Sequence, residues 1–152
     1  MAWDATSGEE RWRLDSLSEV TCLALSPDER TVAAGLTSGQ LLLVSIDGPG
    51  AGVSELRPVG DDADLQPTSG GIKGVAFSPD GQRLYSTAWR TKVSAADGSE
   101  LRVWSVADRR ELRPPVACGN PSPSGLDVSP DGARLLVGTR DGQVEVWSPE
   151  GY

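Results

Sequence analysis

The chain has 152 residues, of which 18 are glycine and 11 are proline, and its formal net charge is −8 at pH 7. This length suits one domain with its own core, and the many turn-forming residues favour short strands joined by turns. The sequence has no histidine, which excludes Ser-His-Asp and Cys-His catalysis and the common imidazole zinc sites. The negative charge disfavours binding to phosphate backbones. We therefore expect a non-enzymatic protein with no cofactor and no nucleic-acid partner.

No stretch approaches the roughly 18 consecutive apolar residues of a membrane helix, and the first residues lack the apolar core of a signal peptide. Cys22 and Cys118 lie far apart in the sequence and form no disulfide framework. These features predict a soluble, cytoplasmic protein that does not engage a membrane.

Short alternating segments separated by turn signals run along the whole chain. The first residues suggest the end of a strand at Ala2-Trp3-Asp4, a turn at Thr6-Ser7-Gly8 and a short strand from Arg11 to Leu14. The next unit contains four predicted strands, at residues 21–26, 30–36, 41–46 and 53–57. The last unit reads as a three-stranded antiparallel meander that ends with strands 134–138 and 144–147.

An internal repeat underlies this pattern. A Ser-Pro-Asp turn begins at Ser26, at Ser78 and at Ser129, so the copies lie roughly fifty residues apart. The second copy carries about eight extra residues between its second and third strands, approximately from Arg90 to Asp97. The three copies predict three versions of one antiparallel sheet.

Strand, Ser-Pro-Asp-Gly turn, strand, Asp-Gly turn, strand and tryptophan is a pattern that resembles the WD40 repeat of β-propellers. Trp3-Asp4 matches the family's Trp-Asp dipeptide, whereas Trp104-Ser105 and Trp147-Ser148 keep only the tryptophan. The family's Gly-His dipeptide is absent. The resemblance therefore implies all-β, four-stranded antiparallel blades that lack the buried Asp-His-Ser/Thr-Trp network and depend more on apolar packing. We expect all three tryptophans to belong to the core.

We interpret residues 1–152 as one propeller segment with repeats at about 1–47, 48–107 and 108–152. Propellers have roughly four to eight blades, and an arc of three leaves two apolar faces and open strand edges. Head-to-tail contact between two copies would close a six-bladed ring and make the protein a homodimer. The strands predicted to meet at the closure contain Arg11, Trp12, Arg13 and Leu14 from one chain and Val144 and Val146 from the other. The alternative is that the chain is a fragment of a larger WD40 protein.

The resemblance to WD40 repeats implies that the protein is a scaffold that binds an unknown protein or peptide. The predicted connections 58–71 and 90–97 are longer than the fold needs and flank the same blade, so they are candidate binding elements. The candidate residues are Asp61, Asp62, Asp64, Trp89, Arg90 and Lys92. The competing interpretations are a solvated acidic loop for the three aspartates and packing beneath its own loop for Trp89.

Two other classes of function make distinct demands on the sequence. An enzyme or small-ligand propeller that uses the central channel would need converging acids, and we find only Asp127, where the other repeats have Ala24 and Ala76. This position predicts a buried carboxylate that pairs with Arg102, Arg134 or a backbone amide. A nucleic-acid binder would instead need one basic face. That face would gather Arg90, Lys92, Arg109, Arg110 and Arg113.

Overall fold

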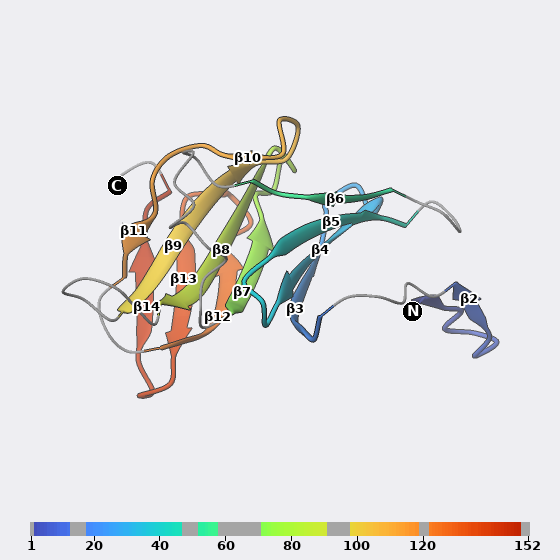
Figure 1. Ribbon diagram of the computed structural model, residues 1–152, viewed down its shortest axis with the longest axis horizontal. Coiled ribbons are helices and arrows are strands. Elements are labelled where there is room, and N and C mark those ends of the chain that lie inside the picture. The colour runs from blue at the N-terminus through green and yellow to red at the C-terminus, as the bar shows by residue number, and fades with distance from the viewer. Residues whose placement is uncertain are drawn as a thin grey trace.

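The computed structural model describes residues 2–12, 18–46, 52–57, 71–90, 98–118 and 122–149. Within these ranges every regular element is a β-strand, which confirms the all-β class. No helix in the described ranges is long and apolar enough to cross a bilayer. The strands form three stacked antiparallel sheets and a separate hairpin (Figure 1).

The first sheet, blade 1, has the strand order β3-β4-β5-β6. Its strands are β3 (Val20–Leu25), β4 (Thr31–Leu36), β5 (Leu41–Ser45) and β6 (Val53–Glu55). The turn between β3 and β4 is closed by the Ser26 hydroxyl, which donates to Asp28 Oδ1 over 2.5 Å. Asp28 Oδ1 also accepts from the Arg30 amide over 3.1 Å. These bonds, with Ser26 the larger contributor, hold the pKa of Asp28 below its usual range.

The second sheet, blade 2, is the largest and has a broken outer strand. Its strands are β7 (Ile72–Phe77), β8 (Arg83–Arg90), β9 (Gly98–Ser105), β10 (Arg110–Glu111) and β11 (Val116–Ala117). Both β10 and β11 pair with β9, at different places along it. The predicted insertion begins within this sheet, because Trp89 and Arg90 extend β8 and pair with Ser99 and Gly98. The insertion therefore lengthens the β8–β9 hairpin as well as its connection.

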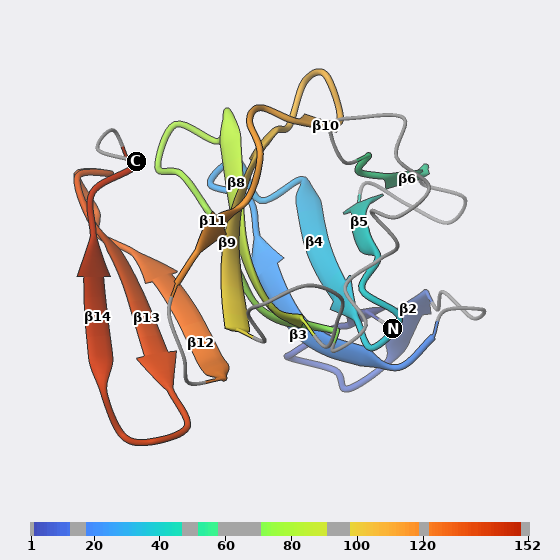
Figure 2. The ribbon, with the colours of Figure 1, turned by 60° about the vertical axis from the view of Figure 1, so that its left-hand side comes forward.

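The third sheet, blade 3, has three strands in the described chain, in the order β12-β13-β14. They are β12 (Pro123–Val128), β13 (Leu135–Thr139) and β14 (Val144–Trp147). The separate hairpin joins β1 (Ala2–Trp3) to β2 (Glu10–Trp12). It lies at the opposite end of the molecule from β14 in both ribbon views (Figures 1 and 2).

Apolar side chains hold the blades face to face. Between blades 1 and 2, Leu43 belongs to one buried cluster with Leu84 and Trp104. Between blades 2 and 3, Tyr85 belongs to a second cluster with Leu135. Burying a side chain of this size contributes about 1.5–3 kcal/mol each, so these clusters are the main force that fixes the arc.

The innermost strands of blades 2 and 3, β7 and β12, lie very close together at Gly74. A Cβ at Gly74 of β7 would lie 2.7 Å from Leu126 Cβ of β12 and 2.9 Å from the Leu126 backbone nitrogen. Only a residue without a side chain fits there, since real Cβ atoms do not approach other atoms so closely. Gly74 therefore sets the distance between blades 2 and 3.

Turns of adjacent blades also stack on one another. A Cβ at Gly81 would lie 3.6 Å from Pro27 Cδ, and one at Gly132 would lie 3.3 Å from Pro79 Cδ. Each proline thus covers the glycine of the next repeat. The matching residue of blade 1 is Glu29, which adopts the same left-handed backbone conformation with φ of 60°.

Replacing Glu29 with glycine should stabilise the protein. A non-glycine residue in the left-handed region costs about 1–2 kcal/mol, part of which is offset by the extra freedom of glycine in the unfolded chain. We expect the free energy of unfolding of Glu29→Gly to rise by about 0.5–1 kcal/mol, measured by urea titration. Glu29→Ala removes the charge but keeps the backbone strain, so it should bring no such gain. An equal gain in both variants would assign the effect to charge instead.

Candidate functional site

The two ends of the arc expose apolar side chains. On blade 1 the exposed fractions of Leu23 and Leu25 are 63% and 52%, and Val53 on the same face is also exposed. We call these three residues the head face. On blade 3, Val144 and Val146 are 70% and 56% exposed. Apolar surface gathered at defined places on a rigid sheet marks an interaction site.

The second apolar surface, which we call the tail face, consists of Leu136, Val144 and Val146. Leu136 lies opposite Val146 in the pairing of β13 with β14, so both side chains leave the same side of blade 3. The other side of this blade carries Leu135 and packs against blade 2. Head face and tail face are thus the outward surfaces of the first and last blades.

Strand β14 also presents an open edge. In blade 1 the third strand, β5, pairs with a fourth, and in blade 2 the third strand, β9, pairs with β10 and β11. Within residues 122–149, β14 pairs with β13 on one side and with no strand on the other. Its unpaired backbone groups are suited to accept another strand.

The β1–β2 hairpin repeats the geometry of the third and fourth strands of blade 2. Trp3 lies opposite Glu10, as Trp104 lies opposite Glu111. The turns also match, because Gly8 and Arg109 occupy equivalent positions and have φ of 71° and 56°. By this comparison β2 is a fourth strand.

The predicted closure residues are only partly placed. Val144 and Val146 are exposed on β14, whereas Arg11 and Trp12 lie in β2, at the opposite end of the arc. Arg13 and Leu14 lie outside the described residues. β2 and β14 do not pair within one copy, where they lie at opposite ends of the arc (Figure 1), and their pairing between copies stays a prediction.

Most of the predicted loop site lies outside the described chain. This is the case for Asp61, Asp62, Asp64 and Lys92. Trp89 and Arg90 end strand β8, where Trp89 is half-buried. The grouping of these six residues into one binding surface stays a prediction.

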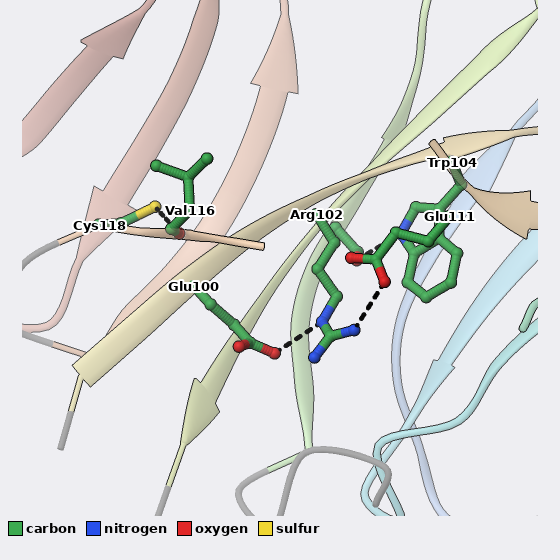
Figure 3. A network of polar contacts seen from close by, with 7 residues as sticks. Glu100, Arg102, Trp104, Glu111, Val116 and Cys118 are labelled. Atoms are coloured by element: carbon green, nitrogen blue, oxygen red, sulfur yellow. Dashed lines mark hydrogen bonds and ion pairs between the residues drawn. The ribbon is translucent and has the colours of Figure 1, made fainter. Parts of the chain in front are cut away.

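Blade 2 contains a buried ion network that sequence analysis did not find (Figure 3). Arg102 Nε lies 2.7 Å from Glu100 Oε1, and its Nη1 lies 3.2 Å from Glu111 Oε2. All three side chains are almost completely buried. Glu111 belongs to β10, so the network fastens the broken outer strand onto β9. Buried charges need such pairing because desolvation is costly.

The tryptophans differ in their surroundings. Trp104 is buried and donates from Nε1 to the Ser86 hydroxyl over 2.9 Å. A tryptophan-serine bond is therefore present in blade 2 even though the sequence has no histidine for the full WD40 network. Trp147 is half-buried and donates to Glu145 Oε2 over 2.9 Å. The side chain of Trp3 is not among the parts of the chain that the structure describes.

The predicted burial of Asp127 is wrong, whereas a backbone amide, one of its three predicted partners, does bind its carboxylate. Its side chain is exposed, and its Oδ1 accepts from the Val128 amide over 2.8 Å. Arg102, one predicted partner, pairs with Glu100 and Glu111 instead. The physical reason is its position, because Asp127 lies opposite Leu136 and shares the outward side of blade 3 with the tail face. Equivalent alanines in blades 1 and 2 are covered by a following blade.

Neither cysteine is suited to nucleophilic chemistry. Burial, followed by the charges of Glu145 and Glu100, raises the pKa of the Cys118 thiol to about 12. Burial also raises the pKa of Cys22. The thiolate is the reactive form, so both groups are inert near neutral pH. Among the described residues, no cluster of three or more His, Cys, Asp or Glu side chains could hold a metal ion.

Antiparallel sheets of three to five strands, stacked face to face with their innermost strands adjacent, define the molecule as part of a β-propeller. The model of the family "WD domain, G-beta repeat" matches residues 12–45, 63–105 and 116–148, which is more than half of the chain. The chain belongs to the WD40 family, as its Ser-Pro-Asp turns and tryptophans indicated.

Curated relatives include two fungal proteins. The chain is 31% identical over 133 residues to a probable dipeptidyl-peptidase 5 of Aspergillus clavatus, covering 77% of this chain and 17% of that protein. It is 29% identical over 131 residues to dipeptidyl-peptidase 5 of Aspergillus fumigatus, covering 77% and 18%. The chain therefore spans less than a fifth of the length of these relatives.

Solved structures share the fold at low sequence identity. The β-propeller domain of Myceliophteria thermophila Cps50 (Swd1) matches with a TM-score of 0.76 and 18% identity, over 98% of this chain and 45% of that one. Kuenenia stuttgartiensis hydrazine synthase matches with a TM-score of 0.65 and 19% identity, over 92% and 35%. At such identities the similarity establishes the fold alone.

Proposed function

We propose that the protein is a non-enzymatic WD40 scaffold for protein interaction, and that two copies join head to tail into a six-bladed propeller. The observation that carries this proposal is the pair of apolar surfaces at the two ends of the arc. Within the chain, such surfaces are covered where one blade follows another. A second copy would cover the head face with a tail face, and the contact would occur twice in the ring.

Strand exchange would complete blade 3. In this arrangement β2 of one copy leaves β1 and pairs with the open edge of β14 in the other copy. The register follows from the two tryptophan-glutamate pairs already present, Trp3 with Glu10 and Trp104 with Glu111. It places Glu10 of one copy opposite Trp147 of the other. Backbone pairing would supply affinity, and the neighbouring apolar faces would supply specificity.

The absence of histidine supports a non-enzymatic function. The curated relatives are called dipeptidyl-peptidases, but a histidine-dependent hydrolytic site would need catalytic groups from outside this sequence. Free thiols in Cys22 and Cys118 are compatible with a reducing compartment and support a cytoplasmic location.

A second arrangement closes the ring with further blades of the same polypeptide. The lengths of the relatives favour it, since the chain spans 45% of the Cps50 chain and about 17–18% of the curated fungal proteins. In that arrangement the head and tail faces contact other blades of one protein, and the scaffold function is the same.

Solution mass distinguishes the two arrangements. Light scattering after gel filtration, repeated over a dilution series, should give a species at twice the 16.0 kDa of one chain. Its mass should fall toward 16.0 kDa only at low concentration, because association depends on concentration. A monomer at all concentrations would contradict closure by a second copy, and a ladder of larger species would indicate open head-to-tail chains.

A further inference from the structure

Three exposed arginines meet at the outer rim of blades 1 and 2. They are Arg57, which follows β6, Arg109 in the turn before β10, and Arg110, the first residue of β10. In the described part of the chain none of them forms an ion pair with a carboxylate. The three positive charges repel one another, and a basic cluster of this kind is unusual in a protein whose net charge is −8. We call these residues the rim arginines.

Backbone hydrogen bonds hold the rim arginines together. The Arg57 amide donates to the Arg109 carbonyl over 3.1 Å, and the Glu111 amide donates to the Arg57 carbonyl over 2.9 Å. Arg57 and Arg110 are partners in an isolated parallel bridge. The chain leaving blade 1 is thus tied to blade 2, and the positive charges are fixed on a rigid part of the fold.

A groove of about 450 Å³ lies between the rim arginines and the edge of blade 1. It is lined by Val53, Ser54, Glu55, Arg57, Asp108 and Arg109. Both acids on its wall have hydrogen-bond donors of their own. Gln40 Nε2 donates to Glu55 over 3.1 Å, and the Ser105 hydroxyl donates to Asp108 over 2.9 Å. Arg57 and Arg109 form no ion pair with these or other acids in the described chain, so their guanidinium groups are available to an external anion.

Arg109 occupies this position despite backbone strain. Its φ of 56° lies in the left-handed region, and the equivalent turn of the β1–β2 hairpin uses Gly8 at φ of 71°. A non-glycine residue in this conformation costs about 1–2 kcal/mol. Strain of this kind tends to persist where a side chain has a function. Here the function that the surroundings indicate is the recognition of negative charge.

From these observations we propose that the groove binds an extended acidic segment of a partner protein. Strand β6 forms one wall and is the last strand of its sheet in the described chain. An extended segment can add to this edge through backbone hydrogen bonds, with carboxylates facing Arg57 and Arg109 and an apolar side chain on Val53. An extended anionic surface, such as a membrane, fits less well because most of the protein repels it.

The proposal extends the scaffold function. Of the groove residues only Val53 also belongs to the head face, and the test removes Arg57 and Arg109, which lie outside both the head face and the tail face. A monomeric mass would therefore contradict closure without affecting the groove. Failure of the groove would equally leave the head and tail faces unaffected.

The test is a fluorescence-anisotropy titration with a labelled octapeptide of four glutamates followed by four valines, which in antiparallel addition to β6 places glutamate beside Arg57 and valine beside Val53. Replacing Arg57 with glutamine and Arg109 with glycine removes two charges, and glycine suits the backbone at 109. This double variant should bind the peptide at least about tenfold more weakly. The matched control is Arg30→Gln with Arg140→Gln, which removes two exposed charges elsewhere and should change affinity less than about twofold.

Two further probes separate strand addition from other anion binding. The same peptide with alternate N-methylated amides should lose binding, since the hydrogen bonds to β6 can no longer form. Vesicles that contain phosphatidylserine should not bind. Equal affinity of the rim variant and the wild type would overturn the proposal, as would vesicle binding without peptide binding. Full binding by the methylated peptide would overturn strand addition along β6.

Discussion

Replacing Val146 with glutamate should dissociate the proposed two-copy assembly into monomers. Val146 is 56% exposed on the tail face, so the substitution costs little in the folding of a single chain. In the ring, however, each glutamate would face the apolar head face and lose its hydration. We expect the dissociation constant to rise at least about 100-fold, because the contact occurs twice. Light scattering or analytical ultracentrifugation over a dilution series measures this change.

Leu112→Glu is the matched control for this substitution. Leu112 is 46% exposed on the outer rim of blade 2, away from both ends of the arc, so its change should leave the mass unaltered. Asp127→Ala tests the same side of blade 3 with a change that should strengthen association between copies. It replaces an exposed carboxylate on the outward side of blade 3 with the residue found in blades 1 and 2, and should tighten association. If Val146→Glu and Leu112→Glu behave alike, the copies do not meet through the tail face.

Local turn chemistry made the strands predictable. In each repeat the serine of the Ser-Pro-Asp turn donates to the aspartate two residues later, a contact that requires no other part of the fold. The prediction of residues 144–147 for the last strand agrees with β14 (Val144–Trp147), because Asp141-Gly142 fixes where that strand begins. Such features depend on a few neighbouring residues and can be inferred without knowing how the blades stack.

Contacts between blades were not predictable in the same way. Asp127 aligns with the half-buried Ala24 and the buried Ala76, each packed against a following blade, and within the described residues no blade follows blade 3. The sequence pattern groups Arg109 and Arg110 with basic residues such as Arg113. In the structure their neighbour is Arg57, which pairs with Arg110 in an isolated parallel bridge. Arg113 instead donates to the Pro149 carbonyl over 3.4 Å. Lys92 and the side chain of Arg90 lie outside the described residues, so the grouping of all five basic residues on one face is not tested.

Replacing Arg102 with leucine should strongly destabilise the protein. Arg102 pairs with Glu100 and Glu111, and its guanidinium carbon lies 6.0 Å from the centre of the Trp104 ring. Leucine would leave two buried carboxylates without their cation and loosen the contact between β10 and β9. Breaking a buried pair by removing one member costs about 3–5 kcal/mol. Urea unfolding followed by tryptophan fluorescence, at one protein concentration, should show a loss of this size.

A neutral version of the network separates charge from packing. Glu100→Gln, Arg102→Met and Glu111→Gln together keep similar volumes and remove every buried charge of the network. Because the wild-type pair also incurs desolvation, this triple variant should recover most of the stability that Arg102→Leu loses. If the triple variant is as unstable as the single one, the packing of the Arg102 side chain decides the effect. A loss below about 1 kcal/mol in Arg102→Leu would mean that the apolar clusters alone hold blade 2 together.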